Sequence, residues 1–191
     1  MSEFQAMSGS NPVKLTIRDY ELLQASGALD RYARVELVEG VIVEVNSEWS
    51  RHAKAKNEIS YRLRDALRAM DATLIALCDV TIRLSDHSLP EPDGIVSSPF
   101  AGSAEYIPGD LVKLAIEVAD TNRAGALGYK YELYGDYALP EYWIVDLRDE
   151  RIHVFWEPKA HGYRRQETIA LGDRLDSRTI PGLSIETASL Y

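Results

Sequence analysis

The sequence predicts a single α/β domain, because helix-like and strand-like hydrophobic patterns alternate along a chain long enough to bury one core. Of its 191 residues, 46% are hydrophobic, with 12 Gly and 8 Pro, a composition typical of a globular domain. The most apolar run, 111–119, is expected to form a central strand covered on both faces. The predicted order of the main elements is a hairpin, a helix, three strands, a second helix and further strands.

The N-terminal region is predicted to contain a tail, a short helix and a β-hairpin. Residues 1–13 are small, polar and aperiodic, so we expect a flexible tail that leaves 14–191 as the folded domain. A helix is predicted over 16–27, where a glycine ends it. Residues 32–45 alternate between apolar and polar on both sides of a Glu-Gly pair, which is typical of a hairpin and places Glu36 in a strand.

The middle of the chain is predicted to form one long helix and two strands. Residues 49–70 carry an apolar stripe at helical spacing, with the basic residues elsewhere around the helix. Residues 73–84 alternate well and are expected to form one strand. A turn-rich stretch that contains Asp93 follows, and it opens a short strand over 95–97.

The C-terminal half continues the alternation of helix and strand. A helix is predicted over 123–138, although its glycines weaken that prediction. Strands are expected over 141–146 and, after a tight turn, over 151–156. Residues 162–191 are expected to hold one or two more strands.

The charge distribution bears on the classes of partner. A net charge of −9 argues against a protein that coats nucleic acid in general, because phosphate binding is driven by Lys and Arg. The segment 51–68 nevertheless carries a net charge of +4, against −13 for the rest of the chain. A basic helix on an acidic body can contact a phosphate backbone, and a solvated polar helix face is the alternative interpretation.

Several classes of site and location are excluded or disfavoured. One Cys (Cys78) rules out an intramolecular disulfide, and one Cys with four scattered His does not make a zinc site. The chain has no Gly-rich phosphate loop, nucleophile elbow or dinucleotide fingerprint. No apolar run approaches the ~18 residues that span a bilayer, and no signal peptide is evident, so a cytoplasmic protein of bacterial type is expected.

Two carboxylates and one ammonium form the main candidate site. Asp93 and Glu117 lie near or within separate strand-like segments, and Lys130 lies on the next helix-like stretch. Hard cations such as Mg²⁺ bind carboxylate oxygens that converge from different segments, and a nearby ammonium can hold a phosphate or orient water. If both faces of the Glu117 strand are covered, an unpaired carboxylate there costs several kcal/mol, so a metal or cation partner is required.

Each candidate also has an interpretation without chemistry. Asp93 sits in a Pro-Asp-Gly sequence, which is typical of a turn. Glu117 could lie on a half-exposed strand, Lys130 could extend its side chain to solvent, and Glu36 could face water. His52 begins the basic helix, where it could contact phosphate, assist proton transfer or simply cap the helix at the surface.

A succession of short motifs resembles one known family. The matching strings are Val35-Glu36-Leu37-Val38-Glu39-Gly40, His52 at a helix start, Pro92-Asp93, Asp110-Leu111-Val112 with Glu117-Val118, Lys130 with Tyr134, and Pro140-Glu141-Tyr142-Trp143-Ile144-Val145-Asp146. Over roughly 15–160 the chain resembles the Uma-type family, which is described as restriction endonucleases of the PD-(D/E)XK superfamily. The resemblance implies a restriction-endonuclease-like core, with a mixed central sheet flanked by helices.

The resemblance also implies site residues, a cofactor and partners. Asp93, Glu117 and the carbonyl of Val118 would bind Mg²⁺, for which Mn²⁺ can substitute, and Glu36 would complete the outer shell of the metal. Lys130 would position the attacking water or the scissile phosphate. His52, Arg51 and Lys54 are candidates for phosphate contacts. The implied activity is Mg²⁺-dependent hydrolysis of DNA phosphodiester bonds, carried out by a homodimer.

The sequence departs from the superfamily pattern at two positions. The Lys expected two residues after Glu117 is Ala119, which leaves Lys130 as the cationic group, and the acidic residue often found four positions before that Lys is Ala126. These departures favour a second hypothesis, a nuclease-fold protein that binds or interacts without catalysis. A third hypothesis is a metal-binding hydrolase of small phosphate esters.

Overall fold

The computed structural model describes residues 12–45, 50–100, 102, 105–120 and 128–191. Most of the predicted tail, 1–13, and part of the predicted helix over 123–138 therefore lie outside the described residues. Within them, the helices are α1 (Ile17–Ala25), α2 (Ser50–Ala69) and α4 (Tyr129–Asp136), with a 3₁₀ turn over Gly109–Leu111, and the strands are β1 (Val35–Val38), β2 (Val41–Glu44), β3 (Ile75–Cys78), β4 (Ile82–Arg83), β5 (Gly94–Ser97), β6 (Ile107–Pro108), β7 (Val112–Ala119), β8 (Glu141–Asp146), β9 (Arg151–Lys159), β10 (Gly162–Ala170), β11 (Arg174–Asp176) and β12 (Ser184–Glu186).

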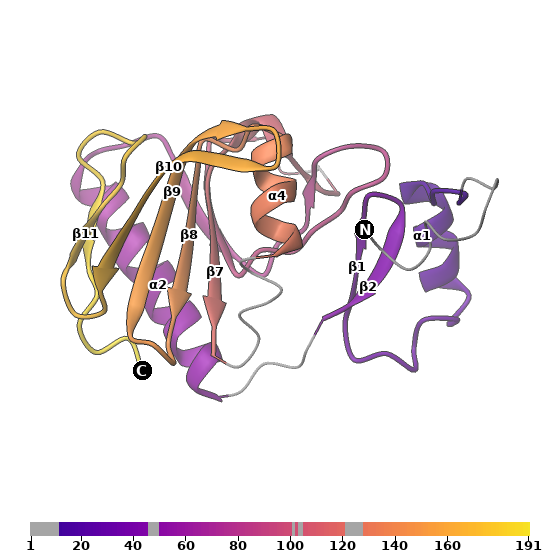
Figure 1. Ribbon diagram of the computed structural model, residues 1–191, viewed down its shortest axis with the longest axis horizontal. Helices are drawn as coiled ribbons and strands as arrows, with labels where there is room; N and C mark the ends of the chain where they lie inside the picture. Colours follow the sequence, from indigo (N-terminus) through magenta and orange to yellow (C-terminus); the bar gives the residue numbers. More distant parts are fainter. Residues whose placement is uncertain (1–11, 46–49, 101, 103–104, 121–127) are drawn as a thin grey trace.

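A six-stranded sheet forms the centre of the molecule, in the order β10-β9-β8-β7-β5-β3 (Figure 1). β7 and β8 run parallel, and the other neighbouring pairs run antiparallel. The expected mixed sheet flanked by helices is therefore confirmed. β7 lies inside the sheet, and seven of its eight residues are buried, as its apolar sequence predicted.

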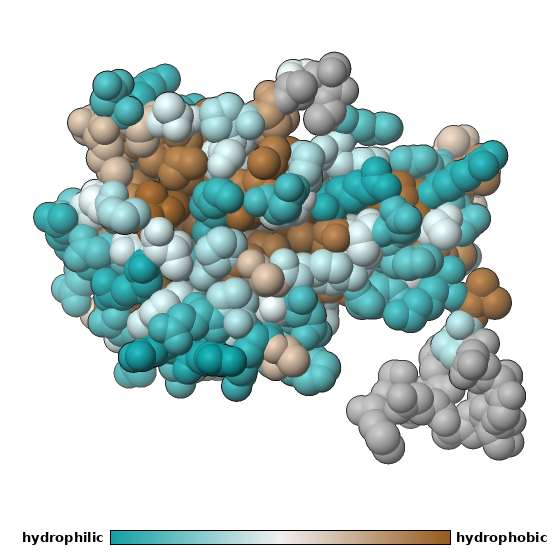
Figure 2. Space-filling view, turned by 90° about the horizontal axis from the view of Figure 1, so that it is seen from above, coloured by the Kyte–Doolittle hydropathy of each residue, from teal (hydrophilic) through white to brown (hydrophobic). Residues whose placement is uncertain are grey.

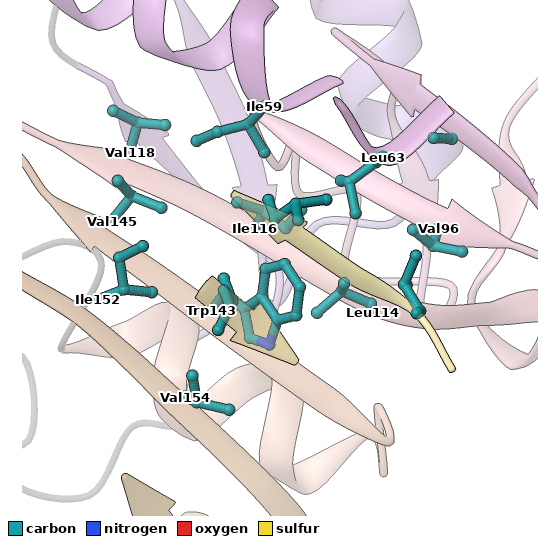
Figure 3. Packing of buried hydrophobic residues seen from close by; sticks show 14 of the residues in the cluster. Ile59, Leu63, Val96, Leu114, Ile116, Val118, Trp143, Val145, Ile152 and Val154 are labelled. Atoms are coloured by element: carbon teal, nitrogen blue, oxygen red, sulfur yellow. The ribbon is translucent and has the colours of Figure 1, made fainter. Parts of the chain in front are cut away.

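Each face of the sheet is covered by its own hydrophobic cluster. On one face, α2 packs through Ile59 and Leu63 against Ile116 of β7 and Trp143 of β8, as Figure 3 shows. On the other face, Leu133 of α4 packs against aromatic side chains of β8, β9 and β10. Alternation along β7 therefore places Leu114, Ile116 and Val118 in the first cluster and Ala115 and Ala119 in the second.

The N-terminal hairpin and α1 form a smaller unit with its own core. β1 and β2 pair antiparallel around Glu39 and Gly40, both of which have a positive φ, as a tight turn requires. Tyr20 of α1 packs with Leu37 of β1 and Leu89 in this third cluster. The N–H of Leu89 donates to the carbonyl of Leu37 at 2.7 Å, which attaches the hairpin to the segment that leads into β5.

Two predicted regions contain more strands than expected. The single strand predicted over 73–84 is two strands, β3 and β4, because Asp79 takes a positive φ of 53° between them and ends the alternation. The region 162–191 holds three strands rather than one or two, since β11 and β12 pair with each other outside the central sheet.

A buried carboxylate fixes the turn between β11 and β12. Glu141, at the start of β8, is fully buried and accepts hydrogen bonds from the indole of Trp143 at 2.6 Å and the hydroxyl of Ser177 at 2.6 Å. The N–H and hydroxyl of Thr179 donate to it as well, at 2.9 and 2.8 Å. Because these donors are neutral and numerous, they replace the water that the carboxylate loses on burial.

Most residues on the face shown in Figure 2 are hydrophilic, although apolar residues gather in a band across it. In the part of the chain that the structure describes, no helix combines the length and the apolar character needed to cross a membrane.

Close packing at Gly135 holds α4, which carries Lys130, against β10. A Cβ at Gly135 would overlap the backbone of Gly162, which begins β10. We therefore expect Gly135→Ala to reduce the free energy of unfolding by about 1–3 kcal/mol, although alanine favours helix more than glycine does. Gly102→Ala, whose Cβ would meet nothing within 4 Å, is the matched control. Equal urea-unfolding midpoints for the two variants would contradict the expectation.

Candidate metal and nuclease site

Asp93 is placed by the register of β5 against β7. Gly94 pairs with Ile116, so Asp93 lies one residue beyond the last pair, beside Glu117 and Val118. The main-chain N–H of Val118 donates to Oδ2 of Asp93 at 2.7 Å. Asp93 is buried, so it is more than a surface turn residue.

Glu117 and Lys130 form a buried ion pair between β7 and α4. Nζ of Lys130 lies 2.9 Å from Oε1 of Glu117, and both residues are buried. The hydroxyl of Tyr134, one turn further along α4, donates to the same oxygen at 3.2 Å. Lys130 therefore does not extend to solvent, and Glu117 does not lie on an exposed face. A buried carboxylate at Glu117 was predicted to require a metal or cation partner, and the ammonium of Lys130 is such a partner.

Glu36 reaches the same ammonium from the N-terminal hairpin. Its Oε1 lies 3.1 Å from Nζ of Lys130, and the residue is fully buried. Lys130 also donates to the main-chain carbonyl of Glu91 at 3.1 Å. The structure thus brings four predicted site residues together from four segments. They are Glu36 of β1, Asp93 directly before β5, Glu117 of β7 and Lys130 of α4. Glu36 does not face water, and its partner is the ammonium.

His52 contacts Asp93 directly. Its Nε2 lies 3.1 Å from Oδ2 of Asp93, and its side chain is 12% exposed. A surface cap is therefore excluded for His52. The sequence had suggested a phosphate contact or a proton-transfer role, whereas the geometry makes His52 a neighbour of a site carboxylate.

The two basic residues predicted beside His52 have different environments. Arg51 donates to the carbonyl of Leu147 at 2.6 Å, and its guanidinium lies 4.0 Å from the ring centroid of Tyr191. A second nitrogen of Arg51 lies 3.5 Å from Asp120. Lys54, in contrast, is exposed. The phosphate contact predicted for Arg51 and Lys54 stays a prediction, and the structure favours Lys54 for it.

Burial and charge set the protonation of the cluster. Burial raises the pKa of Glu117 to about 8, although the ammonium of Lys130 opposes the shift. Burial likewise raises the pKa of Glu36 against the same opposition. Burial alone would lower the pKa of Lys130, but the carboxylates of Glu117 and Glu36 raise it above its ordinary value. The ammonium thus stays charged at neutral pH, while Glu117 changes its charge close to neutrality.

Asp93 behaves differently from the other two carboxylates. Burial disfavours its charged form, yet the hydrogen bond and charge of His52 hold its pKa below the ordinary value, and the Val118 N–H contributes to the same shift. Asp93 is therefore ionised at neutral pH.

The raised pKa of Glu117 predicts a pH-dependent stability. Between the ordinary value of 4.5 and about 8, the folded protein holds a proton on Glu117 that the unfolded chain has lost. The contribution of Glu117 to stability is therefore reduced as the pH rises through this window, by up to about 1.4 kcal/mol per pH unit. Urea unfolding in EDTA should show a steeper decline for the wild type than for Glu117→Gln. Parallel profiles of the two proteins would refute the expectation.

The donor set fits a hard divalent cation. Asp93 and Glu117 supply oxygens from adjacent strands, and the carbonyl of Val118 leaves β7 at the same edge as its N–H, beyond the last residue paired with β5. Among the described residues, no hydrogen-bond donor reaches the buried Oε2 of Glu36. Those residues contain no group of three or more His, Cys, Asp and Glu side chains placed to hold a metal ion. A site of two carboxylates and a main-chain carbonyl is smaller than such a group, so the Mg²⁺ prediction stays a prediction.

Sequence reasoning missed several contacts of the cluster. Tyr134 follows Lys130 by four residues on α4, a spacing that places both on one helix face and could have suggested their shared partner. The carbonyl of Glu91 carried no signal in the sequence, because any residue has one.

Comparisons with known proteins identify the fold and the family of the chain. A solved crystal structure from Anabaena variabilis, described as a "putative nuclease belonging to DUF820", has a TM-score of 0.67 to this chain at 15% sequence identity, covering 94% of this chain and 97% of that chain. This similarity shows that the two chains share a fold. No curated protein matches the chain. The sequence profile of the Uma2 family, described as "Putative restriction endonuclease", matches residues 17–188, and the chain therefore belongs to the Uma2 family.

Proposed function

We propose that this chain is a Mg²⁺-dependent endonuclease that hydrolyses phosphodiester bonds in DNA. The observation that carries the proposal is the convergence of three buried carboxylates (Asp93, Glu117 and Glu36) and one buried ammonium (Lys130) from separate segments. Buried ionisable groups with shifted pKa values are typical of active sites. Burying a charge costs free energy, so such groups are uncommon where no function requires them. Membership of the Uma2 family and the shared nuclease-like fold support the same assignment.

Asp93, Glu117 and the carbonyl of Val118 would hold the metal. Bound there, Mg²⁺ would lower the pKa of a water molecule and neutralise negative charge on the reacting phosphate. Asp93 suits this role because it is ionised at neutral pH and oriented by His52 and the Val118 N–H.

Lys130 would act as a hydrogen-bond donor and a positive charge, because its raised pKa prevents it from serving as a base. Its three N–H groups have three acceptors: Glu36, Glu117 and the carbonyl of Glu91. To contact a phosphate or a water molecule, Nζ must therefore exchange one of these partners for an oxygen of the substrate.

The engagement of all three N–H groups of Lys130 favours a second candidate function. With Lys130 fully engaged and Ala119 in place of the lysine usual in the superfamily, the chain could bind a partner without catalysis. A hydrolase of small phosphate esters would instead cleave nucleotides and leave polymers intact.

Cleavage assays separate these functions. We expect nicking or cutting of plasmid or single-stranded DNA with Mg²⁺ or Mn²⁺, and none in EDTA. Absence of cleavage under all metal conditions, together with no Mn²⁺ binding by calorimetry, would favour the binding protein. The homodimer also remains a prediction. A dimer would place two sites on one duplex, and measuring the molecular mass of the protein in solution tests whether it forms.

A further inference from the structure

One face of α2 forms a continuous exposed stripe. Its members are Lys54, Asn57, Tyr61, Arg64 and Arg68, which we call the outer stripe. They recur at intervals of three and four residues, so they lie one above another on the helix. Four of them are exposed and Arg64 is half-buried, while the opposite face of α2 packs on the sheet.

The outer stripe is positive on an acidic protein. Lys54, Arg64 and Arg68 lie on it, whereas the whole chain has a net charge of −9. Two acids border the outer stripe. Glu58 pairs with Arg62 at 2.8 Å, and Asp65 is 3.8 Å from Arg68 in a pair whose side chains are both at least 75% exposed, which neutralises little. Charge complementarity therefore selects a polyanion as the occupant.

An exposed aromatic ring lies in the middle of the outer stripe. Tyr61 is 59% exposed, and the guanidinium of Arg64 lies 5.7 Å from its ring centroid. An exposed ring between cations is the arrangement on which an unpaired base stacks while its phosphates contact the flanking charges. A base inside a duplex cannot reach such a ring, so the ring selects a single strand.

The N-terminal end of the outer stripe lies in the same turn of α2 as a residue that contacts the site. His52, whose Nε2 lies 3.1 Å from Asp93, precedes Lys54 by two residues, so Lys54 points outward from the turn that carries His52. From Lys54 to Arg68 the helix rises about 21 Å, at about 1.5 Å per residue. Since nucleotides of one strand in a duplex are spaced by about 3.4 Å, and those of an unpaired strand can be spaced further apart, this length suits a few nucleotides.

We infer that the outer stripe binds a single strand of nucleic acid that extends from the site, with phosphates on Lys54, Arg64 and Arg68 and a base on Tyr61. This inference rests on the proposed nuclease function for its substrate. The stripe would hold the strand beyond the reacting phosphate, whereas the buried cluster would act on that phosphate.

Binding in EDTA tests the inference without cleavage. Fluorescence anisotropy would compare a labelled single-stranded oligonucleotide with its duplex. Replacing Lys54, Arg64 and Arg68 together by glutamine should weaken single-strand binding by about 10–100-fold at low salt and lower the salt slope of log K by roughly 2, since each phosphate contact contributes about 0.7. The matched control replaces Lys159, Arg164 and Arg165, which are exposed on the β9–β10 hairpin, by glutamine.

Tyr61 distinguishes a single strand from a duplex. Tyr61→Ala should weaken single-strand binding by about 5–100-fold and leave duplex binding unchanged, while Tyr61→Phe should retain both. An equal loss in the control triple variant, or no effect of Tyr61→Ala on the single strand, would overturn the inference. Strand binding without any metal-dependent cleavage would thus support the stripe and reject the catalysis.

Discussion

Replacing Asp93 by asparagine is expected to reduce metal-dependent cleavage by at least about 10²–10³-fold, the cost typical of removing one preorganised charge contact. Asparagine keeps the size of the side chain, and its carbonyl can still accept the Val118 N–H that holds Asp93 at 2.7 Å. The variant should therefore fold while losing the negative charge that would bind the metal. Initial rates of plasmid cleavage measure the activity.

A binding measurement separates loss of metal from loss of catalysis. Calorimetry should show that Asp93→Asn binds Mn²⁺ more weakly than the wild type does. Asp110→Asn is the control, because Asp110 is an exposed carboxylate before the first residue of β7, at the end remote from Glu117. If Asp93→Asn kept both full Mn²⁺ affinity and full activity, Asp93 would not be a metal ligand.

Replacing Lys130 by methionine is expected to destabilise the fold by about 3–5 kcal/mol at pH 8, the cost typical of removing one partner of a buried ion pair. Methionine fills the space of the aliphatic stem but leaves Glu36 and Glu117 buried without their shared cation. The loss should shrink as the pH falls, because both carboxyl groups have raised pKa values and can take up a proton. Chemical denaturation in EDTA at several pH values measures it.

A double-mutant cycle identifies the interaction. Adding Glu117→Gln to Lys130→Met should recover part of the lost stability, because one of the uncompensated charges is removed. Lys113→Met, which changes a half-buried lysine of β7 outside the cluster, should have little effect. Additive losses in the double variant would show that Glu117 and Lys130 do not stabilise each other.

Much of the fold could be predicted because local patterns and tertiary environment agreed. The run 141–146 became β8 with the predicted bounds, since a continuous apolar strand fits only a sheet covered on both faces. The requirement of Glu117 for a cation followed from the same reasoning, and Lys130 meets it. In this case the apolar pattern predicted burial, and burial required a cation beside the carboxylate.

The remaining features depend on contacts that no local pattern encodes. The break at Asp79 is a single positive φ within an otherwise regular alternation. The third strand of the C-terminal region forms because β11 and β12 pair with each other, and Glu141, far away in sequence, holds the turn between them. His52 was recognised as chemically relevant, but its contact with Asp93 depends on how α2 packs across the sheet.

The charged cluster connects two parts of the molecule, the N-terminal hairpin with its own small core and the central sheet with its helices. Tyr20, Leu37 and Leu89 hold the hairpin in place, apart from the two clusters that cover the sheet. Detachment of this unit alone would withdraw Glu36 from Lys130 while the sheet stayed intact. The electrostatic balance of the charged cluster would then respond to local opening well before global denaturation, and amide exchange in β1 would report that opening.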